Sequence, residues 1–436
     1  MIPLLLLLAV GGLMQAARSF TADSSIAGTE LAFGFLLLAA YFTSKIISRF
    51  GLPKLTGYLI SGVLAGPFVL DLVSDKMGAS LKVVSDTATA ILALEAGAEL
   101  SLKAIRPVMR TLRGITVFAV IGAMFAISAA LFVMRPWLPA IFGDLDTTKS
   151  LVVCCAIGVA LSAQSPAVVM ALLAETRAEG PLSRVVLASV VVADLTVIIV
   201  FSIVLAITGA VIGGDVDVGA TALEVGWELL GSVGFGMVIG GLIGRYLLHV
   251  SQGAVLFALM VCVVVAEVGS RVHLDPLIVC LAAGIFLRNF SKADAHDLLG
   301  KFESAQLPVF LVFFALAGSH LDIGALAAAL VPIAIIAGIR AGSFFVGAKL
   351  ACKLTNAEPV VAKYAWFGLV PQAGLALALA LVLRNTFPTF GAGASAILFG
   401  VVGFNECVAP IVLRAMLVRS GEAGKKQGVD FAVGGH

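Results

Sequence analysis

The chain has 436 residues, of which 60% are hydrophobic and 12% are charged, with a formal net charge of +2. Its mean hydropathy is +1.10. Because soluble domains carry about 25% charged residues, this composition excludes a soluble domain and predicts a polytopic protein in a lipid bilayer. We expect no cofactor and no nucleic-acid partner, and the small net charge says little about other partners.

The N-terminal apolar run at residues 3–17 is short and has no basic residues before it. Gln15-Ala-Ala17 nevertheless resembles the small-residue context of a cleavage site. Residues 1–27 are therefore predicted to be a leader or an extra N-terminal helix, and we favour the helix. Whether residues 1–18 are cleaved stays open.

Thirteen further apolar runs are long enough to be membrane spans. Their limits are 28–49, 55–72, 81–101, 112–134, 148–174, 181–208, 226–248, 253–270, 273–289, 306–320, 324–352, 359–384 and 392–418. They predict an all-α membrane protein with 13 transmembrane helices, or 14 with the N-terminal run. The loops are too short for a soluble domain, and the polar, Gly-rich segment 420–436 is predicted to be a disordered cytoplasmic tail.

Basic residues are distributed unequally over the loops that these spans define. If the loop after the first of the thirteen spans is cytoplasmic, 20 of the 28 Lys and Arg residues lie inside and Arg340 alone lies within a span. Cytoplasmic loops of membrane proteins carry such an excess. The pattern predicts a multi-pass protein of the inner (plasma) membrane with a cytoplasmic C-terminus.

The sixth span, 181–208, carries one carboxylate, Asp194, near the middle of an otherwise apolar run. A charged side chain at the bilayer centre costs several kcal/mol, about 3 on insertion scales, so an acid at this depth indicates a functional site. The plainer interpretation is an aspartate that only forms a hydrogen bond with a neighbouring helix.

Two spans contain interruptions, Leu161-Ser-Ala-Gln-Ser-Pro-Ala167 in the fifth and Gly368-Leu-Val-Pro-Gln-Ala-Gly374 in the twelfth. Proline removes a backbone donor and clashes with the preceding turn. Inside a bilayer such a break persists only where it is packed in protein or lines a wet cavity. We therefore predict two broken helices, at Pro166 and at Pro371, Gln372 and Gly374.

The positions of the breaks predict an inverted repeat. If the seventh span links two six-span repeats, both breaks fall in the fifth span of a repeat, and the two repeats have opposite orientation. Broken helices at matching places of inverted repeats mark a transporter's substrate site. Arg340 and the pair Asn405-Glu406 lie in spans that should adjoin this site.

Motifs in this order resemble a known family. They are Gly57-Tyr-Leu-Ile-Ser-Gly-Val-Leu-Ala-Gly-Pro67, Leu94-Glu-Ala-Gly-Ala-Glu-Leu100, Ala160-Leu-Ser-Ala-Gln-Ser-Pro166 and Pro371-Gln-Ala-Gly374. From about residue 28 to 418 the chain resembles the monovalent cation:proton antiporters, in particular the sodium/proton antiporter and potassium efflux branch. In that resemblance Asp194 matches the ion-binding aspartate and Arg340 matches the basic residue of the adjacent helix.

The resemblance implies a homodimer in which each protomer has a dimer domain and a moving core domain with two crossing, unwound helices. The dimer-domain helices would lie at 28–111 and 251–322, and 226–250 would be the linker helix. The core helices would lie at 112–210 in repeat one and 323–419 in repeat two. One departure is Ala193, because the family usually has Asp, Asn or Gln before the aspartate.

These residues predict exchange of Na⁺ or K⁺ for a proton by alternating access. Burial of a carboxylate favours its neutral form, so a proton and a cation compete for Asp194. Oxygen atoms of Ser162, Gln164 and Ser165 are the further cation ligands that we expect. With Ala193 in place of a second acid, the exchange should be electroneutral and 1:1.

Arg340 and Glu406 are expected to balance the buried charges around the site. A guanidinium stays protonated in proteins, so Arg340 cannot carry the proton. An unpaired buried charge is far more costly than a paired one, and we therefore predict that Arg340 bridges Asp194 and Glu406. The plainer interpretation is that Glu406 faces a cytoplasmic cavity and pairs with Arg414 or water.

Other functions remain open at this stage. An uncoupled cation channel, a non-transporting sensor subunit and an organic-anion transporter could all use the same fold. An enzyme is not expected, because no nucleophile–base pair or metal-ligand cluster occurs at membrane depth. The sequence leaves the choice between Na⁺ and K⁺, the physiological direction and the regulation open.

Overall fold

The structure is a computed structural model, in which every described secondary-structure element is a helix. It describes residues 2–18, 26–143, 145–212, 226–250, 253–272, 274–292, 311–319, 330–387 and 389–425, and the single residues 223, 308, 321 and 324. The long elements are α1 Ile2–Arg18, α2 Ile26–Ser48, α3 Lys54–Ala65, α5 Lys82–Glu99, α8 Gly122–Met134, α10 Thr147–Leu161, α11 Pro166–Thr176, α12 Pro181–Ile212, α14 Ser232–His249, α15 Ala254–Arg271, α16 Pro276–Phe290, α19 Leu330–Thr355, α20 Pro359–Gly368, α21 Gly374–Thr386 and α22 Gly391–Arg419. The short ones include α4 Asp75–Ser80, α6 Leu102–Ile105, α7 Met109–Gly114, the π-helical turn η2 Ile115–Ile121 and α9 Pro139–Phe142.

Most of the predicted spans correspond to helices. Within the described residues, seven helical stretches are long and apolar enough to cross a membrane, and five shorter helices are apolar. The predicted run 112–134 belongs to one continuous stretch, Arg106–Trp137, that includes α7, η2 and α8. Parts of the predicted spans 306–320 and 324–352 fall outside the described residues, so the count of 13 or 14 membrane helices stays a prediction.

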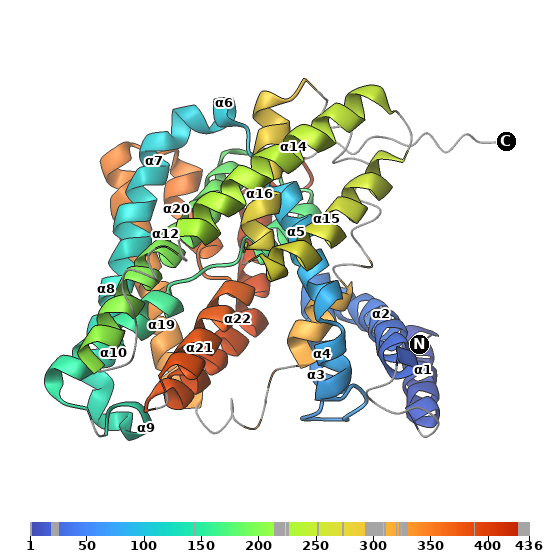
Figure 1. Cartoon of the computed structure of the whole chain (residues 1–436), viewed down its shortest axis with the longest axis horizontal. Coiled ribbons are helices and arrows are strands. Elements are labelled where there is room, and N and C mark those ends of the chain that lie inside the picture. The colour runs from blue at the N-terminus through green and yellow to red at the C-terminus, as the bar shows by residue number, and fades with distance from the viewer. Residues whose placement is uncertain are drawn as a thin grey trace.

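The helices pack as two groups. The first group, at the centre and right of Figure 1, contains α1, α2, α3, α5, α14, α15, α16 and the helical residues 311–319. The second group, mainly at the left, contains α7, η2, α8, α10, α11, α12 and α19 to α22. Between the groups, α11 packs on α5 and α3, and α22 packs on α3. α11, which follows the first predicted interruption, and α22 therefore lie at the boundary of the groups.

Glycines bring two helix pairs of the first group into close contact. A Cβ at Gly97 of α5 would clash with the carbonyl oxygen of Leu281, and one at Gly284 of α16 would clash with that of Leu94. The same reciprocal arrangement joins Gly62 of α3 to residues 311–319. Small residues allow membrane helices to approach closely, which explains the packing role of the Gly57–Pro67 motif.

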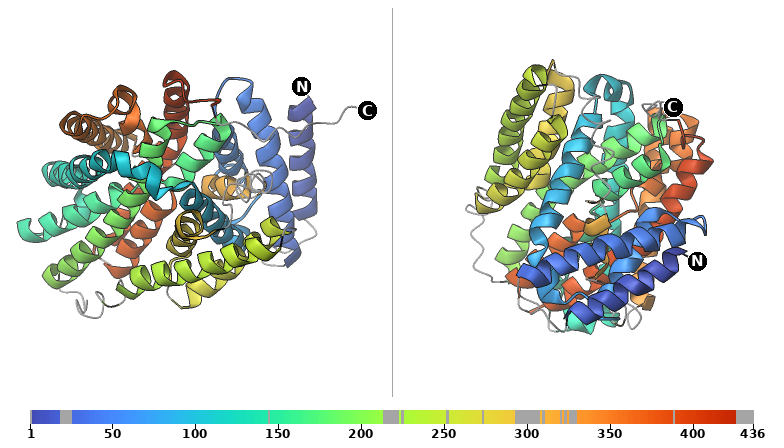
Figure 2. Two further views of the ribbon diagram at one scale, coloured as in Figure 1. Left: turned by 90° about the horizontal axis from the view of Figure 1, so that it is seen from above. Right: turned by 90° about the vertical axis from the view of Figure 1, so that its right-hand side faces the viewer.

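The N-terminal residues Ile2–Arg18 form a helix that lies beside α2 in both views of Figure 2. These residues are helical, and the choice between a leader and an extra membrane helix stays a prediction; residues 19–25 lie outside the described part.

The predicted disorder of segment 420–436 is wrong for its first residues. Ser420–Lys425 are described, and the carboxylate of Glu422 is only 2% exposed. Its oxygens accept hydrogen bonds from the backbone N–H groups of Leu182 and Ser183, both at 2.8 Å, and from the Ser183 hydroxyl at 2.7 Å. The first N–H groups of a helix have no partner within the helix, and Glu422 satisfies two of these at the start of α12. Residues 426–436 lie outside the described part.

Candidate functional site

The first interruption lies between α10 and α11, at the residues predicted for it. α10 ends at Leu161 and α11 begins at Pro166. Ser165 adopts an extended conformation before the helix, and its hydroxyl oxygen accepts a hydrogen bond from the N–H of Val168 at 3.2 Å. A serine N-cap followed by proline at the first helical position is a strong helix start. The break is thus encoded locally, and its residues are buried in protein.

The second interruption lies between α20, which ends at Gly368, and α21, which begins at Gly374. Pro371 and Gln372 are buried within it, whereas Gly374 is exposed. The amide nitrogen of Gln372 donates to the carbonyl oxygen of Leu161 at 2.8 Å. This hydrogen bond crosses from one interruption to the other, so the two broken helices meet where their backbones are unwound.

Arg340 of α19 is completely buried and connects the same two interruptions. It donates to the carbonyl oxygens of Leu161 (2.7 Å) and Ala163 (2.7 Å) in the first break. It also donates to those of Val370 (2.6 Å) and Leu369 (3.3 Å) in the second. The last carbonyls of a helix lack partners and carry a partial negative charge. The guanidinium therefore balances this charge at the ends of two half-helices.

The predicted bridge from Arg340 to Asp194 and Glu406 is therefore wrong. The guanidinium donates to four carbonyl oxygens, and neither carboxylate is among its partners. The alternative pairing of Glu406 with Arg414 is not formed either, because Arg414 lies beside Glu175. Glu406 is 4% exposed, and its Oε2 atom has no hydrogen-bond partner.

Asn405 extends the hydrogen bonds at the second interruption. Its amide nitrogen donates to the side-chain oxygen of Gln372 at 2.7 Å, and Gln372 in turn donates to Leu161. Sequence reasoning noticed Asn405 only as the neighbour of Glu406 and did not select it as a site residue. The available signal was an amide side chain in an apolar helix, since such a side chain needs a partner when buried.

Asp194 lies on α12 beside the first interruption. Asp194 is 4% exposed, its Oδ1 atom has no hydrogen-bond partner, and the backbone N–H of Gln164 lies near its carboxylate. The side-chain oxygen of Gln164 is also buried without a partner, while its amide nitrogen donates to the carbonyl oxygen of Ser162 at 3.1 Å. Two oxygen atoms that could bind a cation therefore belong to neighbouring residues, and the carboxylate oxygen could instead take up a proton.

The two serine hydroxyls of the break are engaged with the backbone. Ser162 donates to the carbonyl oxygen of Val159 at 2.7 Å, and the Ser165 oxygen accepts from Val168. Each hydroxyl oxygen has two lone pairs, so both atoms keep acceptor capacity. Of the three uncharged side chains predicted as ligands, Gln164 is the one whose oxygen has no hydrogen-bond partner.

A small cavity reaches Asp194 at the boundary of the two helix groups. Its lining is mostly apolar, and Thr89 of α5 is the polar neighbour that sequence reasoning missed. The lining comes from α5, α11, α12 and α16, and consists of Thr89, Leu92, Ala93, Ala96, Pro166, Ala167, Val191, Asp194, Leu195, Ile198, Leu277, Ile278 and Leu281. A buried carboxylate thus lies on a surface shared by two separately packed groups of helices.

Comparison with known sequences identifies relatives. The family profile described as "Sodium/hydrogen exchanger, transmembrane" matches residues 5–419. A protein of Escherichia coli (strain K12) named "Putative cation/proton antiporter YbaL" is 26% identical over 268 residues, which are 61% of this chain and 43% of that protein. "Probable Na(+)/H(+) antiporter 3" of Methanocaldococcus jannaschii is 22% identical over 279 residues, 61% of this chain and 64% of that protein. The chain spans less than two thirds of either relative.

Two solved structures of the sodium proton antiporter MjNhaP1 from Methanocaldococcus jannaschii share the fold. The structure at pH 8 superposes with a TM-score of 0.60 and covers 89% of this chain and 94% of that one. The electron-microscopy structure has a TM-score of 0.67 and covers 91% and 98%. Sequence identity is 15% in both cases, so these structures support the fold alone. Since the family profile covers nearly the whole sequence, the chain belongs to the sodium/hydrogen exchanger family of transmembrane proteins.

Proposed function

We propose that the protein exchanges one monovalent cation, Na⁺ or K⁺, for one proton by alternating access, with Asp194 as the shared binding residue. The observation that carries this proposal is the buried Oδ1 atom of Asp194, which has no hydrogen-bond partner although it lies next to an interrupted helix. Buried carboxylates in stable proteins are normally paired or neutral.

The hydrogen bonds of Arg340 strengthen the case for Asp194. Because the guanidinium compensates the carbonyls of both half-helices, it does not neutralise the aspartate. Asp194 must then be neutralised by a proton or by a bound cation. A hard monovalent cation prefers oxygen ligands, and the Gln164 side-chain oxygen, with the hydroxyl oxygens of Ser162 and Ser165, would complete the site.

We assign the two helix groups to the two domains of an alternating-access transporter. Within the first group, 28–111 and 251–322 would be the dimer domain of a homodimer, with α14 in the linker helix 226–250, and the second group, 112–210 and 323–419, would be the moving core. The reciprocal glycine contacts support the inverted repeat, since α5 pairs with α16 as α3 pairs with residues 311–319. The excess of basic residues supports a cytoplasmic C-terminus.

The test is exchange by the purified protein in liposomes that contain a pH-sensitive dye. Pulses of Na⁺, K⁺ and Li⁺, compared side by side, should move protons with at least one of them. The absence of any cation-driven proton movement in correctly oriented, folded protein would contradict the function. The same assay identifies the cation.

Electroneutrality is tested by imposing a membrane potential on these liposomes. One carboxylate that alternates between one proton and one cation carries the same charge on both strokes, so the exchange rate should not respond to voltage. A clear voltage dependence would contradict the 1:1 exchange and would direct attention to Glu406, another buried acid, whose Oε2 atom has no hydrogen-bond partner.

A further inference from the structure

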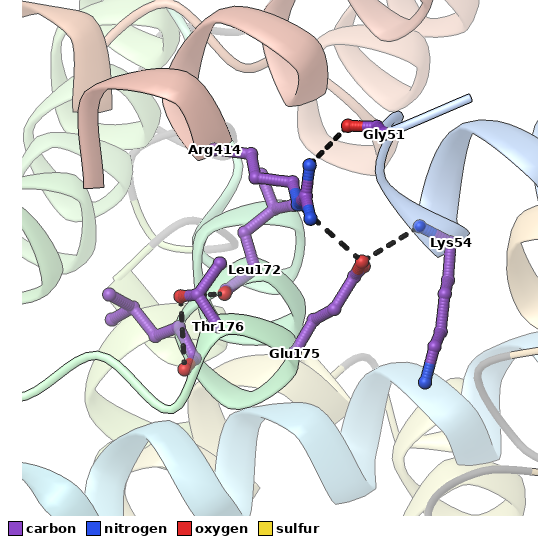
Figure 3. Close-up of polar contacts among 7 residues, drawn as sticks. Gly51, Lys54, Leu172, Glu175, Thr176 and Arg414 are labelled. Atoms are coloured by element: carbon purple, nitrogen blue, oxygen red, sulfur yellow. Dashed lines mark hydrogen bonds and ion pairs between the residues drawn. The ribbon is translucent and has the colours of Figure 1, made fainter. Parts of the chain in front are cut away.

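A polar cluster joins the two helix groups at one end of the molecule (Figure 3). Glu175, at the end of α11, accepts a hydrogen bond from the backbone N–H of Lys54 at 2.8 Å. The same carboxylate oxygen lies 4.0 Å from Nε of Arg414 on α22. Arg414 also donates to the carbonyl oxygen of Gly51. We call these four residues, Gly51, Lys54, Glu175 and Arg414, the gate cluster.

The charges of the gate cluster match the helix ends that they contact. Lys54 is the first residue of α3, so Glu175 meets the N–H end of that helix. Gly51 lies in the turn three residues beyond the end of α2, so Arg414 meets a single carbonyl oxygen on the C-terminal side of that helix. An acid at a helix N-terminus and a base at a C-terminus are both favourable. The turn between α2 and α3 therefore offers an N–H group to Glu175 and a carbonyl oxygen to Arg414, both of which belong to the second group.

The gate cluster and the Asp194 cavity lie at opposite ends of α11. Pro166 and Ala167, at the start of α11, line the cavity, whereas Glu175 is at its other end. Nine residues of helix separate Pro166 from Glu175, which corresponds to about 14 Å. The cavity also includes Leu277 and Ile278, from the first turn of α16. The contacts between the groups are therefore tight at the gate cluster and leave space beside Asp194.

The chain after α22 reinforces the same end of the second group. The N–H of Gly424 donates to the carbonyl oxygen of Thr176, next to Glu175, at 2.9 Å. The N–H of Glu179 donates to the carbonyl oxygen of Glu422 at 3.1 Å. With the Glu422 cap on α12, these bonds tie α11, α12 and α22 into one unit. If one of these helices moves relative to α3, the others move with it.

We propose that Glu175 and Arg414 form a gate of the transport cycle, which closes the face bearing the α2–α3 turn while the Asp194 cavity lies beyond it. Opening this face separates Glu175 from Lys54 and Arg414 from Gly51. This inference rests on the proposed alternating access of Asp194 and adds the contacts that must break in one half of the cycle. By the distribution of basic residues, the gated face is the cytoplasmic one.

The test measures access to the cavity without measuring transport. Val191, which lines the cavity, is changed to cysteine in a background in which the exposed Cys407 is replaced by serine. A membrane-impermeant methanethiosulfonate reagent is then applied to the gated face in oriented vesicles. Glu175→Ala with Arg414→Ala should raise the labelling rate about tenfold, because removing charge-assisted contacts shifts a two-state equilibrium by this order.

A matched control is the ion pair between Glu267 and Arg271, which lies within the single helix α15. Glu267→Gln with Arg271→Gln removes an acid–base pair that does not join the two groups, so labelling should stay at the parent rate. Glu175→Gln keeps an acceptor for Lys54 but loses the charge, and should give an intermediate rate. Equal labelling in the gate variant and the parent would overturn the gate, as would an equal rise in the control.

Cross-linking provides the reverse test. Lys54→Cys with Glu175→Cys, joined by a short bis-methanethiosulfonate reagent, should hold the gate closed and lower cation-driven proton exchange about tenfold or more. Reduction of the cross-link should restore the rate. Full exchange by the cross-linked protein would overturn the gate. If the parent protein showed no exchange, the proposed function would fail, whereas the labelling rates would still decide whether this face is gated.

Discussion

Glu422 and Asp194 are two buried acids that lie at the start and in the middle of α12, and they differ in the hydrogen bonds that they accept. Glu422 is 2% exposed and accepts three hydrogen bonds at the start of α12. Asp194, in the middle of the same helix, is 4% exposed, and its Oδ1 atom has no partner. Burial is nearly equal, so the difference lies in the hydrogen bonds that the protein supplies.

This contrast has a direct physical consequence. Donors that converge on a carboxylate favour its charged form and hold it in place. A buried carboxylate without sufficient donors is costly when charged, so it gains from taking up a proton or a cation. Glu422 therefore fastens the helix on which Asp194 is carried, whereas Asp194 is left able to exchange its partner. The following changes test that division.

The largest effect on transport is expected for Asp194→Asn. Asparagine has the same shape but cannot alternate between a negative and a neutral form, so cation-driven proton movement should fall to that of empty liposomes. Its unfolding should stay close to that of the parent in detergent. Glu422→Gln is the matched control and should retain exchange. Normal exchange by Asp194→Asn would contradict the assignment.

The largest effect on stability is expected for Arg340→Ala. This change removes the donor of several buried carbonyls in both interruptions, and each buried acceptor left unsatisfied costs about 1–3 kcal/mol. The free energy of unfolding in detergent measures this loss. Arg340→Lys should recover part of it, because an ammonium group offers three donors without the planar geometry. A loss below about 1 kcal/mol would show that water replaces the guanidinium.

A smaller effect is expected for Glu422→Ala. The N–H groups of Leu182 and Ser183 lose their acceptor at the start of α12, and leaving buried donors unsatisfied costs about 1–3 kcal/mol. The thermal unfolding temperature should fall, while exchange persists at temperatures below the transition. If exchange were lost in folded Glu422→Ala, the division between a fastening acid and an exchanging acid would not hold.

The smallest effect is expected for Glu406→Gln. Oε2 of Glu406 has no hydrogen-bond partner to lose, and the amide has the same volume, so the free energy of unfolding should change by less than about 1 kcal/mol. Because Arg340 does not pair with Glu406, the effects of Arg340→Ala and Glu406→Gln should be additive in a double-mutant cycle. Strong coupling between the two substitutions would indicate instead that Arg340 and Glu406 interact.

Features with a local cause could be predicted from the sequence. The interruption at Pro166 depends on a serine cap and a proline within a few residues, and Asp194 stands out because its neighbours are apolar. The partners of Arg340 could not be predicted, because they are backbone carbonyls, which every residue possesses and no residue type reveals. An arginine in a membrane span suggested a carboxylate partner, but two helix ends supply the negative charge instead.

Tertiary contacts of the termini and loops were also beyond sequence reasoning. The segment after Arg419 has the polar, Gly-rich composition of a disordered tail, yet Glu422 accepts a hydrogen bond from Leu182, 240 residues earlier. The sequence suggests Glu406 as a partner for Arg414, whereas its contact with the α2–α3 turn follows only from the packing of α22 on α3. Composition does not show which helix end a charge will meet.

The most direct test of the central claim is the number of protons released when a cation binds to the purified protein. Calorimetry in buffers of different ionisation enthalpy, with Na⁺ or K⁺ as titrant, gives this number without transport. In the proposed mechanism Asp194 holds a proton or a cation but not both, so one proton should leave per cation bound, and Asp194→Asn should bind neither cation. Cation binding without proton release, or unchanged binding by Asp194→Asn, would contradict the account.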